Sequence, residues 1–226
     1  MNLKSDKSDQ RYVLKKLQEF AHFFEEHFLN KTVHFTFKNG NYNTAVRVKF
    51  MPHQFQHLVG ITYDLGANAF WEHVLKGNVS WKAVKLTDFA RQRSNKFGRD
   101  KRTNFEKKLN TISSAKDIMT EKVRICTEGE LFGVEYDHLI RTNRQTIGLA
   151  SKTAKFGEYF LSNLDLTDVT DRDKRGEKVV QLTSFNNQRL LYKIYFKKVD
   201  IKKGKKYKHV NKGADHRIKV GMKKAN

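Results

Sequence analysis

The feature that most constrains the fold is a series of short β-strand patterns in the second half of the chain. Six segments rich in Val, Ile, Leu, Tyr and Phe recur there at intervals of about ten residues, with turn-like stretches between them. They are residues 123–126, 131–136, 146–150, 157–161, 178–182 and 190–196. Even spacing with short connections is typical of antiparallel pairing. The second half therefore predicts a mainly antiparallel sheet.

The first half adds helices to this sheet. Apolar residues recur every three or four positions over residues 10–29, which predicts an amphipathic helix with a phenylalanine stripe. Residues 32–37 and 44–50 alternate with period two around Asn39-Gly40, which predicts a β-hairpin. Helical spacing returns from about Ala67 to Gly77, and Ser80 is a candidate N-cap for a further short helix over residues 81–86. The expected fold class is α+β, with helices packed on a mainly antiparallel β-sheet.

Composition divides the chain into three parts. Residues 1–9 are polar and predict a flexible N-terminus, and residues 10–196 carry the patterns of a single α+β domain. Residues 197–226 hold twelve Lys and Arg against two Asp, a net charge of +10, with too few apolar residues for a core. This last part predicts a basic C-terminal tail that adds salt-sensitive affinity for polyanions.

The net charge narrows the class of partner. There are 45 Lys and Arg against 24 Asp and Glu, a net charge of +21. A chain this basic favours nucleic acid as partner, with an anionic membrane surface as the alternative. No membrane span and no signal peptide is apparent, and the single cysteine, Cys126, allows no intrachain disulfide. These features predict a cytoplasmic protein.

Residues 51–60, Met-Pro-His-Gln-Phe-Gln-His-Leu-Val-Gly, form the most distinctive stretch. A short helix starting after Pro52 would place Phe55, Leu58 and Val59 on a buried side. His53 and His57 are four residues apart and would share another face. A histidine at the rim of a core is suited to proton transfer, although such a residue is also common as an ordinary packing residue.

The order Phe-x-His-Leu-x-Gly after an alternating strand resembles the phage-associated PBECR4 domain, a branch of the barnase–EndoU–colicin–RelE-like nucleases. Phe55, His57, Leu58 and Gly60 carry the resemblance. A weaker likeness continues through residues 61–63, the helix around Phe70 and residues 136–139. The resemblance implies a site on the antiparallel sheet near His57, and tRNA or another structured RNA as substrate.

Several other chemistries lack their motifs. The sequence has no phosphate-binding Gly-rich loop, no dinucleotide fingerprint, no H-E-x-x-H and no G-x-S-x-G. His53 and His57 have a spacing that can clamp a metal, but no carboxylate lies between them and no cysteine pair exists. We therefore expect neither a cofactor nor a metal.

Metal-independent RNA cleavage needs only a general base, a general acid and cations beside the phosphate. His57 is the candidate acid/base residue, and Lys152 and Thr153, together with Ser151, follow the predicted strand 146–150 and offer a cation and hydroxyls. Nucleic-acid contacts are expected from basic residues in four places, each of which could also be an ordinary solvated surface. They are His53; Arg91, Arg93, Arg99 and Arg102; Arg141 and Arg144; and Lys202, Lys203, Lys205 and Lys206.

The function hypothesis is a metal-independent endoribonuclease of phage or mobile-element toxin type, with a cognate acidic inhibitor protein as a further expected partner. The first alternative is a non-catalytic nucleic-acid-binding protein that uses the same basic surfaces. A membrane-surface or ribosome-associated interaction protein is the second alternative. All three need the positive charge, and only the first needs His57.

Overall fold

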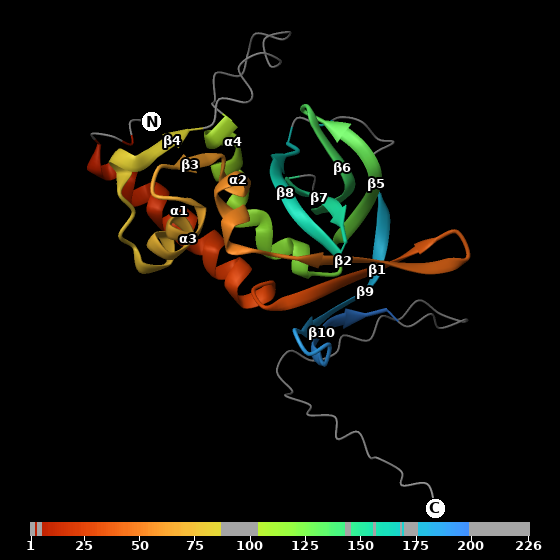
Figure 1. Ribbon diagram of the computed structural model, residues 1–226. Helices are drawn as coiled ribbons and strands as arrows, with labels where there is room; N and C mark the ends of the chain where they lie inside the picture. Colours follow the sequence, from red (N-terminus) through yellow and green to blue (C-terminus); the bar gives the residue numbers. More distant parts are fainter. Residues whose placement is uncertain are drawn as a thin grey trace, which may run out of the picture.

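The computed structural model describes residues 3, 6–86, 104–142, 146–155, 157–167, 169 and 176–198 (Figure 1). It confirms the predicted α+β class, with helices on one side and a large, mainly antiparallel sheet on the other. The α-helices are α1 (Lys7–His27), α2 (Phe55–Val59), α3 (Ala67–Lys76) and α4 (Asn104–Thr111). Short 3-10 helices are η1 (Pro52–Gln54), η2 (Trp81–Ala83) and η4 (Ile112–Met119).

The main sheet has eight strands in the order β1-β2-β8-β7-β6-β5-β9-β10. The strands are β1 (Lys31–Asn39), β2 (Tyr42–Lys49), β5 (Val123–Leu131), β6 (Val134–Thr142), β7 (Ile147–Ala154), β8 (Gly157–Asp165), β9 (Glu177–Asn186) and β10 (Leu191–Lys197). Strand β9 pairs with both β5 and β1, so seven strands form a closed ring of pairings and β10 extends from β9. Every pairing in this sheet is antiparallel except β2–β8.

Helix α1 begins at Lys7, earlier than predicted, because Asp6 caps it. The Asp6 carboxylate accepts hydrogen bonds from the backbone N–H groups of Ser8 and Asp9. Residues 7–9, predicted as part of a flexible terminus, therefore form the first helical turn. The phenylalanine stripe of α1 is buried as expected.

The front hairpin follows its prediction. Residues 31–39 of β1 pair with β2 around the turn at Gly40, whose φ of +60° is a backbone conformation that glycine adopts readily. Inward residues Val33, Phe35 and Phe37 are buried. His34, predicted on a solvated face, is half-buried because β9 pairs along the other side of β1 and places Phe185 against it, 4.4 Å between ring centroids.

Two predictions of secondary structure were wrong, and one helical region was not predicted. Residues 131–136, predicted as one strand, contain the β5–β6 turn at Phe132 and Gly133, both at positive φ. Residues 81–86 form η2 and then strand β4 (Val84–Leu86), because β4 pairs with β3 (Ile61–Tyr63) in a separate small sheet. The helical turns α4 and η4 were missed, although Phe105, Leu109 and Ile112 have helical spacing and are buried.

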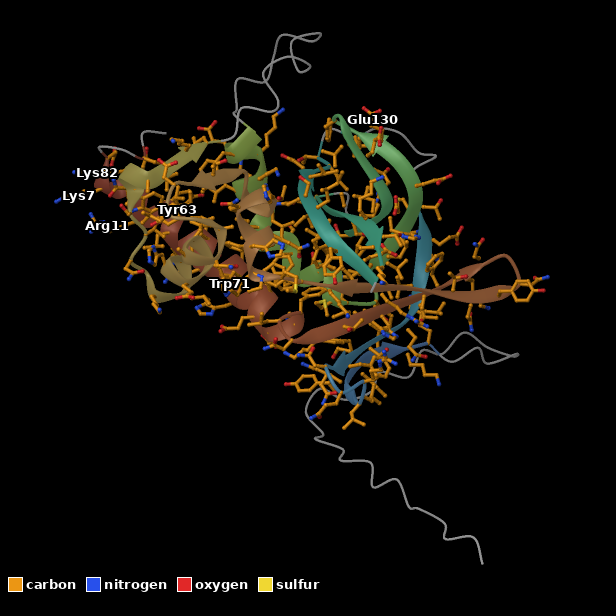
Figure 2. The ribbon with its side chains drawn as sticks, viewed as in Figure 1. Lys7, Arg11, Tyr63, Trp71, Lys82 and Glu130 are labelled. Carbon is orange, nitrogen blue, oxygen red and sulfur yellow. The ribbon has the colours of Figure 1, made fainter. Side chains whose placement is uncertain are left out.

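The core lies between the helices and the sheet. Phe24 of α1 contacts Phe50 and Phe160, at 4.5 and 5.4 Å between ring centroids, so the first helix joins the front hairpin to β8. Tyr63 and Trp71 belong to the helical side, and Glu130 lies at the far end of the β5–β6 hairpin (Figure 2). Among the described helices, none combines the length and hydropathy that a bilayer crossing requires.

Candidate functional site

The Phe-x-His-Leu-x-Gly motif forms α2 and its C-terminal cap. The chain turns through η1, which starts at Pro52, and α2 ends at Gly60, whose φ of +72° and ψ of +38° make it a left-handed cap. Phe55 is fully buried, with its ring centroid 5.1 Å from that of Trp71 and 5.9 Å from that of Phe20. These contacts fix the rotation of the helix about its axis. His57 is consequently held on the opposite, exposed side.

A buried lysine lies beneath this helix. Lys108 of α4 donates hydrogen bonds from Nζ to the backbone carbonyl of His57, at 2.8 Å, and to Oγ of Ser162, at 2.9 Å. The lysine is only 6% exposed, and this burial lowers its pKa to about 8. Its ammonium is thus a cation held directly behind the histidine.

Strand β8 also holds Lys108 in place through Asn163, the residue that follows Ser162. Asn163 is fully buried, and its Nδ2 donates to the Lys108 carbonyl at 3.2 Å and to Thr111 Oγ1 at 3.1 Å. Thr111 Oγ1 also donates to the Lys108 carbonyl, at 2.8 Å. The position of His57 therefore depends on a continuous polar network from β8 through α4 to α2.

The surroundings of His57 favour the neutral ring. Partial burial lowers its pKa from the ordinary value, and the positive charges of Lys108 and His53 lower it further. Among the described residues, none forms a hydrogen bond with this ring. An exposed, neutral imidazole with a free nitrogen can accept a proton near pH 7.

Lys152 and Thr153 lie near the end of β7, beside Asp137 of β6. Lys152 Nζ is 3.1 Å from Asp137 Oδ1, and the Thr153 backbone N–H donates to Asp137 Oδ2 at 2.8 Å. The hydrogen bonds from Thr153, followed by Lys152, lower the pKa of Asp137 to about 2. Within the described part of the chain, neither Lys152 nor Thr153 forms a hydrogen bond or an ion pair with His57.

The predicted nucleic-acid contacts have different surroundings. His53 is exposed on η1, whereas Arg141 is 2% exposed, and its Nε lies 3.5 Å from the Thr142 carbonyl. A side chain so deeply buried offers little surface to a phosphate. The remaining predicted residues lie outside the described ranges: Arg91, Arg93, Arg99, Arg102, Arg144, Lys202, Lys203, Lys205 and Lys206.

A cationic surface lies beside the start of α1 (Figure 2). A depression of about 340 Å³ there is lined by Lys7, Gln10, Arg11, Leu14 and Trp81. Lys7 and Arg11 are exposed, and the Trp81 indole is half-buried. Cations beside a flat ring can bind the phosphates and unstacked bases of a single strand.

The sequence identified neither Ser162 nor Asn163 as part of a site, and it placed Lys108 only within the basic segment 88–108, as a candidate phosphate contact and not as a buried partner of His57. One signal was present: Lys108 falls three residues after Phe105 and four before Ile112, so it lies on the apolar stripe of a helix. A lysine on a buried stripe indicates a cation with a specific partner. Ser162 and Asn163 carry no comparable signal. Among the described residues, no group of three His, Cys, Asp or Glu side chains is placed to hold a metal ion.

Comparison with known protein families identifies one model that matches this chain. It is PBECR4, described as phage-Barnase-EndoU-ColicinE5/D-RelE like nuclease4, and it matches residues 16–212, which are 197 of the 226 residues. No curated protein and no solved structure matches the chain. The family match confirms the resemblance to PBECR4, and a nuclease family implies a nucleic-acid substrate. The chain therefore belongs to the PBECR4 family of barnase–EndoU–colicin–RelE-like nucleases.

Proposed function

We propose that this protein is a metal-independent endoribonuclease in which His57 acts as the general base. The observation that carries the proposal is the exposed imidazole of the family motif, anchored through its backbone carbonyl by the buried Lys108. A lowered His57 pKa supplies the unprotonated ring that a base requires.

The proposed reaction is attack by a ribose 2′-hydroxyl on the adjacent phosphorus. His57 takes the 2′-hydroxyl proton, the bond from the 2′-oxygen to phosphorus forms, and the bond from phosphorus to the 5′-oxygen breaks. The products are a 2′,3′-cyclic phosphate and a 5′-hydroxyl, once the leaving oxygen has gained a proton. Positive charge beside the phosphate stabilises the transition state. In this proposal Thr153 supplies a hydroxyl, whereas Lys152 lies on the opposite face of β7 and pairs with Asp137.

The substrate in this proposal is a structured RNA such as tRNA. Net charge of +21 favours a polyanion, and the depression beside Trp81 adds a place for an unstacked base. We further propose a toxin-type role in the cytosol for a phage or mobile element, with an acidic inhibitor protein as partner, because a strongly basic surface favours a partner of opposite charge.

The test is incubation of the purified protein with total tRNA in EDTA. Wild-type protein should cleave, and His57→Ala should lose about 100-fold or more in rate while still binding RNA. His22→Ala is the matched control, because His22 is an exposed histidine on α1 away from the motif, and it should cleave normally. Binding without cleavage by wild-type protein would instead support the non-catalytic nucleic-acid-binding alternative. Equal cleavage by His57→Ala would exclude His57 as the base.

A further inference from the structure

Three polar side chains meet on neighbouring strands of the sheet, outside the network that holds His57. They are His138 of β6, Ser151 of β7 and Glu158 of β8. His138 Nδ1 lies 3.0 Å from Glu158 Oε1, and Ser151 Oγ donates a hydrogen bond to Glu158 Oε2 at 2.7 Å. The Glu158 carboxylate is therefore held between a hydroxyl and an imidazole.

This cluster lies on the same face of the sheet as Asn163, which donates to the Lys108 carbonyl. His138 is opposite Ser151, and Ser151 is two residues after Leu149, which is opposite Asn163. Side chains two apart in a strand, or directly opposite in a pair, share one face. Thr153, two residues after Ser151, is opposite Glu158 and also lies on this face. The β6–β8 face thus carries both the Asn163 network and the His138 cluster.

The three side chains differ in exposure, and only His138 is accessible enough to reach a substrate. Ser151 is fully buried and the Glu158 side chain is 9% exposed, whereas the His138 side chain is 23% exposed. The His138 Nδ1 atom is buried and lies within ion-pair distance of Glu158 Oε1, although this contact lacks the geometry of a hydrogen bond. The exposed part therefore belongs to the rest of the side chain, and Nε2 is the ring nitrogen that remains for a substrate. A buried carboxylate is costly to maintain, and here its ion-pair partner is one partly exposed imidazole.

We propose that His138 is the second proton-transfer residue of the nuclease, acting as the general acid from Nε2. This proposal rests on the proposed function. As the bond from phosphorus to the 5′-oxygen breaks, the proton on Nε2 passes to that oxygen, while His57 holds the proton from the 2′-hydroxyl. His138 ends neutral and His57 ends protonated, so atoms and charge balance. Glu158 and Ser151 are positioning residues that do not touch the substrate.

The test compares two versions of one RNA after the cleavage position has been mapped. One has the natural 5′-oxygen at that position, and the other has sulfur there, a leaving group that needs no proton. His138→Gln should lower kcat on the natural RNA about 100-fold, with KM little changed, and should cleave the sulfur-substituted RNA at nearly the wild-type rate. His57→Ala should lose activity on both, because the 2′-hydroxyl must still be deprotonated.

Glu158→Gln provides a second variant, which keeps an acceptor for Ser151 but removes the charge beside His138. It should lose about 10-fold on the natural RNA and recover on the sulfur-substituted RNA, even if His138→Gln fails to fold. Equal losses on both RNAs, or wild-type rates on the natural RNA, would overturn the role of His138. If wild-type protein cleaves neither RNA, the proposed function itself fails, and the two failures are distinguishable.

Discussion

At the scale of the residue, the buried Lys108 both holds the candidate site together and costs folding stability. Its amine lies in the protein interior and satisfies the backbone carbonyl of His57 and the hydroxyl of Ser162. Lowering its pKa from 10.5 to about 8 corresponds to about 3 kcal/mol of preference for the neutral amine in the folded state. A residue that costs stability and holds His57 is more easily explained by a role in the candidate site than by a role in folding.

The first prediction concerns folding stability and pH. Between the folded pKa of about 8 and the unfolded value of 10.5, the unfolded chain keeps the Lys108 proton and the folded chain releases it. Stability contributed by this group therefore rises with pH in that window and is lowest below pH 8. The free energies of unfolding of wild-type protein and Lys108→Met can be measured in urea at each pH. Their difference should change by about 2 kcal/mol between about pH 7 and about pH 9.5. A constant difference would mean that Lys108 has an ordinary pKa.

The second prediction concerns the pH dependence of cleavage. A base must be unprotonated, so kcat/KM should fall as pH drops through the pKa of His57, which lies below its usual 6.5. Lys108→Met removes a positive charge beside the ring, so the acidic limb of the profile should move to higher pH. His22→Ala should leave the limb in place. A limb that stays unchanged in Lys108→Met would show that another group controls it.

At the scale of the element, α2 is too short to be stable alone and depends on its buried side and its C-terminal cap. A five-residue helix gains little from its own hydrogen bonds. Burial of Phe55, Leu58 and Val59 fixes its inner side, and Gly60 allows the sharp turn into β3. The four residues of the Phe-x-His-Leu-x-Gly motif thus divide into two that pack, one that caps and one, His57, that is exposed.

The third prediction tests the cap. Gly60→Ala places a side chain at φ +72°, which should cost about 1–2 kcal/mol of unfolding free energy in urea titrations. Gly60→Asn is the matched control, because asparagine tolerates the left-handed conformation better and should cost less. Equal losses would indicate that crowding around the buried Gly60, and not its backbone angle, determines the effect.

At the scale of the whole molecule, one apolar core joins the helices to the ring of strands. Phe20 and Phe24 of α1 contact the motif helix, the front hairpin and β8, through Phe55, Phe50 and Phe160. Most buried residues from α1 to Leu182 of β9 form one large cluster, and a smaller second cluster lies within the sheet, around Cys126, Tyr136 and Leu139. The large cluster spans both helices and strands, and a single domain of residues 10–196 stays a prediction.

The fourth prediction is that the helices and the sheet unfold together, and two native probes test it. Trp71 and Trp81 report on the helical side by fluorescence, and the buried Cys126 thiol of β5 reports on the sheet by its reactivity. Both should change at the same urea concentration. Phe24→Ala should lower both midpoints together, with a loss of about 3–5 kcal/mol. Exposure of Cys126 before the tryptophan signal changes would indicate two separately folding parts.

Local periodicity by itself determined much of this protein. The phenylalanine stripe of α1, the Asn39-Gly40 hairpin, the short helix after Pro52 and the α+β class follow from side chains repeating every two or about 3.6 residues. The family motif and the net charge are likewise properties of the sequence. Failures of prediction arose where pairing overrode local pattern, as in residues 84–86, which pair with β3 as a strand.

Tertiary structure alone decided the ring of strands and the partners of the candidate catalytic residues. Lys108 is 51 positions from His57, and Glu158 is 20 positions from His138, so no local repeat relates them. Their meeting depends on which strands pair and in which register, and a shift of one residue would turn each side chain to the other face. Burial by the rest of the fold then sets the pKa of the lysine and of the motif histidine, because desolvation acts only once the chain has closed around them.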